Sequence, residues 1–142
     1  TGRVDRRGQI QMLAQIAAHS GKQGETLTEL VRVMPSAVTS SWAVVLRTPE
    51  TGLERVAASP AAPEDDGSNP QMPDIDGARI LQPDFDEWVP ESWYQLGTAL
   101  TVTPLHGTDL VLVIGRVGGP DFLASEVREI GDLGCIVGAM LR

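Results

Sequence analysis

The most constraining stretch of this 142-residue sequence is a pair of apolar runs with a short turn between them, over residues 98–116. The first run reads T-A-L-T-V-T-P-L and the second L-V-L-V-I-G-R, with H-G-T-D in between. Four turn-type residues are too few for anything but two adjacent, reversed strands. Leu110 to Ile114 is continuously apolar, which is typical of a strand covered on both faces. We therefore expect this hairpin in the middle of a sheet, with a layer packed on each side.

Two helical patterns precede the strands. Residues 5–19 place Ile10, Leu13, Ile16 and Ala17 at helical spacing, and Ser20-Gly21 suits a helix end. A second stripe starts near Glu25 or Thr26 and comprises Leu27, Leu30, Val31, Met34 and Val38. Pro35 lies inside it, and an internal proline costs a helix about 3 kcal/mol. Because Val38 keeps the stripe in phase, we expect a bent helix rather than one that ends near Met34.

The sequence closes on a third helical pattern, from Ala124 or Ser125 to the end. Its apolar face comprises Val127, Ile130, Leu133 or Gly134, Val137 and Leu141. Gly131, Gly134 and Gly138 lie in the same helix, and each costs about 1 kcal/mol relative to alanine unless it gains something. We interpret these glycines as a helix face without side chains, against which another backbone can pack closely. The partner could be the sheet, the first helix, or the same helix of a second chain.

The remaining segments predict short strands and one long loop. Residues 42–48 and 53–59 read as a second hairpin across P-E-T-G, and residues 78–81 as a short strand. Between them, residues 59–77 hold four prolines, five acids and no base. Such a composition builds no packed core and predicts a mobile or draped loop, and loops of this length inside compact domains are often functional lids.

An aromatic cluster follows the long loop. Trp88, Trp93 and Tyr94 fall within the fourteen residues D-F-D-E-W-V-P-E-S-W-Y-Q-L-G. Asp84 or Asp86 is a candidate N-cap for a short helical turn there, and a proline at position 90 should interrupt or restart that turn. The cluster is therefore the chain's main concentration of large apolar side chains outside the strands and helices.

Length and composition limit the classes of protein. At 142 residues we expect one domain, spanning 1–142. Eleven basic against nineteen acidic residues give a net charge of −8, which disfavours nucleic acid as a partner. No stretch is long enough for a membrane span and no signal peptide opens the chain, so a cytoplasmic location is the expectation. Thr1 is not Met and the last helix still runs at Arg142, so we expect a piece of a longer protein.

The sequence carries none of the common catalytic or metal-binding motifs. It holds no H-E-x-x-H, G-x-x-x-x-G-K-[ST], G-x-S-x-G, C-x-x-C or G-x-G-x-x-G motif. Its only candidate bases, His19 and His106, lie at a helix end and in a hairpin turn. D-I-D-G at 74–77 lacks the further ligands of a calcium loop. We expect a non-enzyme without a metal site, and a buried, structural Cys135 without a disulfide.

The order of elements resembles that of a GAF domain, the small-molecule-sensing module of bacterial signalling proteins. The resemblance rests on Pro104-Leu105, Gly115-Arg116, Phe122 and the helix from Ala124 to Leu141. It implies an α/β fold of the α+β type, with a central antiparallel sheet of five or six strands. The N- and C-terminal helices would lie on one face, and the long loop and short helix on the other. A PAS domain is the rival fold, but it usually leads with one cap helix, whereas this chain leads with two.

The resemblance also implies a ligand site. In GAF domains the pocket is roofed by the segment between the early strands and the central hairpin, which here is the 59–77 loop. Trp88, Trp93 and Tyr94, with Arg79 just upstream, would lie over that sheet face, either as pocket walls and a polar handle or as a plug that fills the space.

The residues give no signature for a known cofactor of the resembled family. The single Cys135 neither matches the bilin-attaching cysteine nor supplies the several cysteines of the branch that reduces methionine sulfoxide. No histidine stands in the usual place for haem. The cyclic-nucleotide branch carries an N-K before its Phe and an acidic pair after it. Phe122 and Glu126 match in part, but Arg116, Val117 and Gly118 do not supply the N-K, and Val127 replaces the second acid. The resemblance therefore implies no particular cofactor or ligand.

Two functions remain open. The first is a non-catalytic sensory domain that binds a small molecule under the loop and relays through its terminal helices to an output domain beyond Arg142. That output would belong to a two-component or other bacterial signalling protein, such as a histidine kinase, a phosphatase or a transcription regulator. The alternative is a ligand-free scaffold that only pairs two chains. Both predict a homodimer through the terminal helices.

Overall fold

The structure is a computed structural model that describes residues 23–37, 40–47, 54–64, 73–82, 84–94, 98–118 and 120–141. The predicted helix at 5–19 lies outside these residues, as do Val38 and Arg142. The described elements, in chain order, are α2 (Gln23–Ala37), β1 (Trp42–Arg47), β2 (Glu54–Ala58), β3 (Arg79–Ile80), the 3-10 helix η1 (Glu91–Tyr94), β4 (Ala99–Pro104), β5 (Leu110–Arg116) and α3 (Ala124–Leu141).

The five strands form one antiparallel sheet in the order β2-β1-β5-β4-β3. The predicted central hairpin is confirmed, because β4 and β5 pair directly and β5 is the middle strand. All seven residues of β5 are buried, as its continuous apolar run predicted. The turn between the strands reverses the chain at Gly107, whose φ of 84° favours glycine.

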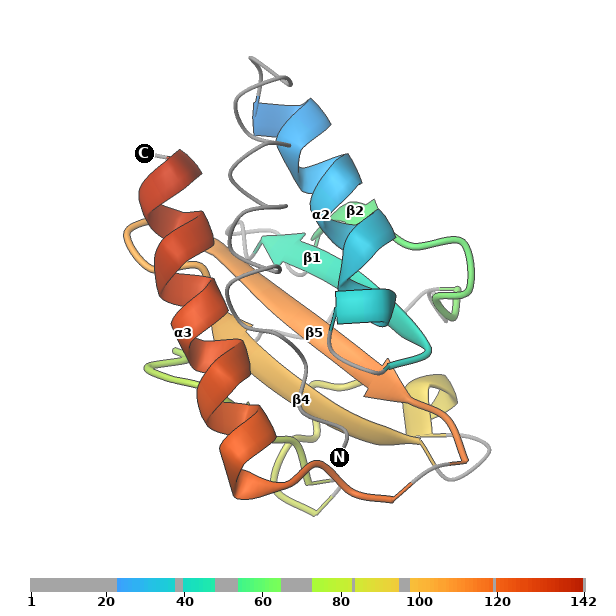
Figure 1. Ribbon diagram of the computed structural model, residues 1–142. Coiled ribbons are helices and arrows are strands. Elements are labelled where there is room, and N and C mark those ends of the chain that lie inside the picture. Colours follow the sequence, from blue (N-terminus) through green and yellow to red (C-terminus); the bar gives the residue numbers. More distant parts are fainter. Residues whose placement is uncertain are drawn as a thin grey trace.

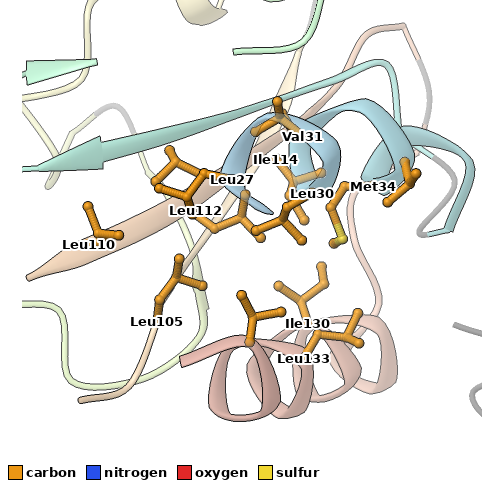
Figure 2. Close-up of a cluster of buried hydrophobic side chains, with 14 of the residues drawn as sticks. Leu27, Leu30, Val31, Met34, Leu105, Leu110, Leu112, Ile114, Ile130 and Leu133 are labelled. Atoms are coloured by element: carbon orange, nitrogen blue, oxygen red, sulfur yellow. The ribbon is translucent and has the colours of Figure 1, made fainter. Parts of the chain in front are cut away.

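Helices α2 and α3 lie on the same face of the sheet, which we call the helix face (Figure 1). Figure 2 shows Leu27, Leu30 and Met34 of α2 directed toward the strands, with Ile130 and Leu133 of α3 opposite them. These five side chains are at most 3% exposed, and each such burial stabilises the fold by about 1.5 to 3 kcal/mol. The predicted stripes of both helices are therefore the stripes that cover the sheet.

Pro35 does not end α2, which continues to Ala37, while Val38 lies outside the described residues. The proline cannot donate to the carbonyl four residues earlier, and the helix ends two residues after it. The chain turns back immediately afterwards, since the Ser40 amide donates to the Pro35 carbonyl at 3.0 Å.

Gly134 and Gly138 bring α3 against the backbone of the sheet. A Cβ on Gly134 would lie 2.5 Å from the Pro104 carbonyl oxygen, and one on Gly138 would overlap the main chain of His106. The His106 amide donates to the Gly134 carbonyl at 3.3 Å. Gly131 differs, because its Cβ would meet only the Ala78 side chain, at 3.1 Å. Of the partners that the sequence left open, the strand β4 and its turn lie against Gly134 and Gly138.

An ion pair fastens the junction between β5 and α3. The Arg116 guanidinium donates to Glu126 at 2.6 and 3.3 Å, and its carbon lies 4.2 Å from the centre of the Phe122 ring. The Leu123 amide donates to the same carboxylate at 2.8 Å, so Glu126 also caps the start of α3. These hydrogen bonds, with Arg116 contributing most, lower the pKa of Glu126.

Among the described residues no helix is both long and apolar enough to cross a membrane.

Candidate ligand-binding face

The opposite face of the sheet, which we call the ring face, is covered by side chains of irregular segments. Its strand residues alternate with those of the helix face, as a pleated sheet requires. The buried members are Trp42, Val44, Leu46, Leu81, Trp88, Val89, Trp93, Leu100, Val102, Val111 and Val113. Ala62, Ile75 and Tyr94 are partly buried against them.

Trp93 lies at the centre of the aromatic contacts. It is 1% exposed, and its ring meets that of Trp42 edge to face, with the centroids 5.6 Å apart. The Arg55 guanidinium lies over Trp93 at 5.9 Å, which is cation–π range. The indole of Trp42 in turn lies across Gly115, where any Cβ would overlap it. Trp93 therefore fills the space over the sheet in the manner of a plug.

One ion pair ties the aromatic segment to the edge of the sheet. The Arg79 guanidinium donates to both carboxylate oxygens of Asp86, at 2.6 and 3.0 Å, and the Gln82 amide donates to one of them at 2.7 Å. The Asp86 side chain is 2% exposed, whereas that of Arg79 is 43% exposed. Burial raises the pKa of Asp86, but the hydrogen bonds and charge of Arg79 and the Gln82 amide outweigh it, so that pKa is lowered overall. The pKa of Arg79 is raised, chiefly by its hydrogen bonds to Asp86.

Several polar atoms on this cover are buried without a hydrogen bond. Within the described part of the chain, Ser92 Oγ, Trp93 Nε1 and Tyr94 Oη have no hydrogen-bond partner. The indole N–H of Trp88 makes no hydrogen bond of acceptable geometry either, although its nearness to Asp86 adds slightly to the lowering of that pKa. Burial, and then the charge of Asp86, raise the pKa of Tyr94 to about 12, so its hydroxyl stays protonated at neutral pH.

The described ends of the 59–77 loop rest on the ring face. Ala62 and Ile75 pack against the aromatic cluster, and the Pro63 carbonyl accepts a hydrogen bond from Arg55 at 2.6 Å. Ser59 anchors the start of the loop, since its hydroxyl accepts from the Ala43 amide at 2.9 Å. Parts of residues 59–64 and 73–77 therefore contact the ring face, while 65–72 lie outside the described residues.

This fold is also found in proteins of known structure. No family model and no curated protein matches the sequence. Among solved structures, free methionine-R-sulfoxide reductase from Neisseria meningitidis in complex with its substrate matches with a TM-score of 0.73 and 14% identity, over 96% of this chain and 87% of that one. The phycocyanobilin-bound GAF domain of a cyanobacterial phytochrome matches with a TM-score of 0.73 and 10% identity, over 96% and 93%. The chain has the GAF fold.

A third similar structure is the GAF domain of an Acinetobacter phosphoenolpyruvate-protein phosphotransferase. Its TM-score is 0.71, with 10% identity over 96% of this chain and 92% of that one. The expected arrangement of a GAF fold is confirmed: a five-stranded antiparallel sheet with helices on one face and the loop and short helix on the other.

Three of the four predicted ligand-face residues, Trp88, Trp93 and Tyr94, lie together in the ring-face cluster, whereas Arg79 is partly exposed at the edge strand β3. Trp88 and Trp93 are buried and Tyr94 is partly buried, as expected for residues over the sheet. The guanidinium of Arg79, expected as a polar handle, is instead occupied by Asp86. Asp86, considered only as an N-cap, accepts from Arg79 and the Gln82 amide, and the 3-10 helix begins after Pro90.

Three residues of the chain lie where the sequence analysis did not expect them. Trp42 and Arg55 join the ring face although they come from early strands. The expectation of a buried Cys135 is wrong, because that side chain is exposed. Cys135 follows the buried Leu133 by two residues, which is about 200° around a helix, so it faces away from the sheet. Within the described ranges, no three His, Cys, Asp or Glu side chains gather as metal ligands.

Proposed function

We propose that this chain is a non-catalytic sensory domain of a bacterial signalling protein that binds a small molecule at the ring face. The observation that carries the proposal is the cover of that face: the 3-10 helix η1 holds the buried Trp93 and the partly buried Tyr94, whose polar side-chain atoms have no partner within the described residues. A ligand pocket combines apolar walls with a few polar groups, and this cover supplies both. The substrate-bound and bilin-bound structures with the same fold add support, since each holds a small molecule.

The proposed relay runs through the terminal helices. A ligand that reorders the cover between 59 and 96 would act on the sheet, and the sheet contacts α3 through Gly134 and Gly138. We propose that α3 passes the change to a second copy of the chain, in a homodimer, and to an output domain beyond Arg142, in a cytoplasmic two-component or related protein. The proposal that the domain is not an enzyme is supported by the single, exposed Cys135, because a sulfoxide reductase of this fold would need several cysteines.

A metabolite screen by thermal shift and native mass spectrometry tests the proposal. A ligand that binds only the folded chain raises its melting temperature with concentration. The expected hit binds at least about 10-fold more weakly to Trp88→Leu, because that change removes a buried wall of the ring face. Phe85→Leu is the matched control, since Phe85 lies in the same segment and is 86% exposed. If no compound stabilises the chain, or if Trp88→Leu binds every hit normally, the proposed function fails.

A scaffold without a ligand is the second candidate, and the plug-like packing of Trp93 against Trp42 favours it. The fold would then serve only to pair two chains. Analytical ultracentrifugation of the chain at high concentration tests this candidate. A dimer without any metabolite hit would support the scaffold, and a strict monomer would count against it.

A further inference from the structure

The 3-10 helix η1 concentrates unsatisfied hydrogen-bonding groups in an unusual way. Ser92, Trp93 and Tyr94 follow one another, and within the described residues each has a buried polar atom without a partner. Native proteins leave few such atoms, because a buried donor without an acceptor loses its bonds to water and gains nothing. Among the described residues nothing supplies acceptors to these three neighbouring groups, and a bound molecule is the source that we consider here.

The chemistry of these atoms narrows the missing partner. The indole Nε1–H of Trp93 can only donate. The phenol of Tyr94 stays protonated and can donate, and the serine hydroxyl can do the same. The partner must therefore bring hydrogen-bond acceptors. The buried sheet surface of the ring face is apolar and includes Trp42, Leu46 and Leu100, so the body of the partner should be apolar too.

The charges on this face are already engaged. Asp86 is nearly inaccessible and accepts from Arg79 and from a backbone amide. The guanidinium of Arg55 donates to the Pro63 carbonyl and lies over Trp93. An anion or cation entering this face would lose its hydration and find its natural counter-charge occupied, which disfavours either.

We propose that the ring face takes a small uncharged molecule with an apolar body, whose acceptor atoms satisfy the donors of η1. The inference rests on the proposed function, because it assigns a ligand class to the same face. Carbonyl groups and aromatic ring nitrogens are the acceptors that such a molecule would carry.

Tryptophan indole resonances provide a direct test. The chain holds three tryptophans, so a nitrogen–proton correlation spectrum shows three indole signals, which Trp→Phe variants assign. The probes are N,N-dimethylbenzamide, which is neutral and carries an acceptor, toluene, which carries none, and benzoate, which is an anion. We expect the amide to shift the Trp93 signal saturably, and toluene and benzoate to bind at least about 5-fold more weakly, as the loss of one hydrogen bond or a charge penalty predicts. A flat titration with the amide, or benzoate binding as well as the amide, overturns the proposal.

Tyr94→Phe gives a second, independent measurement. Removing an unpartnered hydroxyl removes a cost, so the variant should melt at the same temperature as the wild type or about 3 °C higher, and bind the amide about 5-fold more weakly. Phe85→Leu serves as control and should change neither quantity. A clear drop in the melting temperature of Tyr94→Phe would show that the hydroxyl already has a partner, such as an ordered water, and would refute the inference.

The two proposals can fail separately. A charged metabolite that stabilises the wild type but not Trp88→Leu would sustain binding at the ring face while overturning the uncharged class. An absence of every hit, together with flat indole titrations, would remove the proposed function itself.

Discussion

The two faces of the one sheet are stabilised in different ways. On the helix face, two regular helices satisfy their own backbone and contribute aliphatic side chains such as Leu30, Ile130 and Leu133, which carry no polar atoms (Figure 2). On the ring face, irregular segments contribute Trp88, Trp93 and Tyr94, whose polar atoms need partners. On the helix face, Thr101 carries a buried hydroxyl without a hydrogen-bond partner within the described residues. The ring face carries several such atoms, on Trp88, Trp93 and Tyr94, and recognition is the role that we propose for it.

The largest effect should come from a cavity in the helix face. Ile130→Ala should lower the free energy of unfolding by about 3 to 4 kcal/mol, because Ile130 is fully buried between α3 and the sheet. Urea unfolding followed by circular dichroism measures the change. Leu123→Ala is the control, since Leu123 is 65% exposed and should cost less than about 0.5 kcal/mol. A loss below about 1 kcal/mol for Ile130→Ala would contradict this view of the helix face.

A methyl group added between α3 and the sheet should rank next. Gly138→Ala should cost about 2 to 3 kcal/mol, because the new Cβ overlaps the main chain of His106, which cannot yield as a side chain can. Gly131→Ala is the matched control in the same helix. Its Cβ meets only the Ala78 side chain, so its stability should stay within about 1 kcal/mol of the wild type. Equal losses for the two variants in urea unfolding would show that the close approach at Gly138 is not the cause.

The ion pair of the ring face should contribute less. Asp86→Asn should lower the free energy of unfolding by about 2 kcal/mol, because the Arg79 guanidinium and the Gln82 amide lose a charged acceptor while Arg79 keeps part of its contact with water. Asp84→Asn, two residues away and exposed, should change stability by less than about 0.5 kcal/mol. An unchanged Asp86→Asn variant would mean that the cover does not depend on this pair.

The smallest effect concerns the dependence of stability on pH. The pKa values of Asp86 and Glu126 are lowered in the folded state. Each carboxylate therefore stabilises the folded chain at pH values above its unfolded pKa of about 4. That contribution is lost as the pH falls through the folded pKa. Urea midpoints between pH 7 and pH 3 should therefore drop less for Asp86→Asn and for Glu126→Gln than for the wild type. Parallel curves for all three proteins would rule out a role for these groups in acid unfolding.

The same contrast explains which features the sequence could predict. The helix face follows from periodicity: the stripe of α2 from Leu27 to Met34 is buried, and β5 is buried throughout because its run is continuously apolar. The aromatic cluster was predictable as a cluster, since Trp88, Trp93 and Tyr94 are close in sequence. Its connections were not. The pairing of Arg79 with Asp86 depends on how an irregular segment turns, and no periodicity specifies that.

The partner of the glycines in α3 could not be predicted from the sequence either. Gly134 and Gly138 indicate that another backbone lies close, but only the fold shows that this backbone is β4 and its turn. Cys135 illustrates the opposite limit. Its apolar neighbours suggested burial, yet its angular position around the helix directs it outward.

The seating of Gly138 on the His106 main chain limits how α3 can move. A Cβ at position 138 would overlap that main chain, so no bulkier residue fits there without a shift of the backbone. If a ligand displaces the β4–β5 turn, we therefore expect the second half of α3 to be displaced with it.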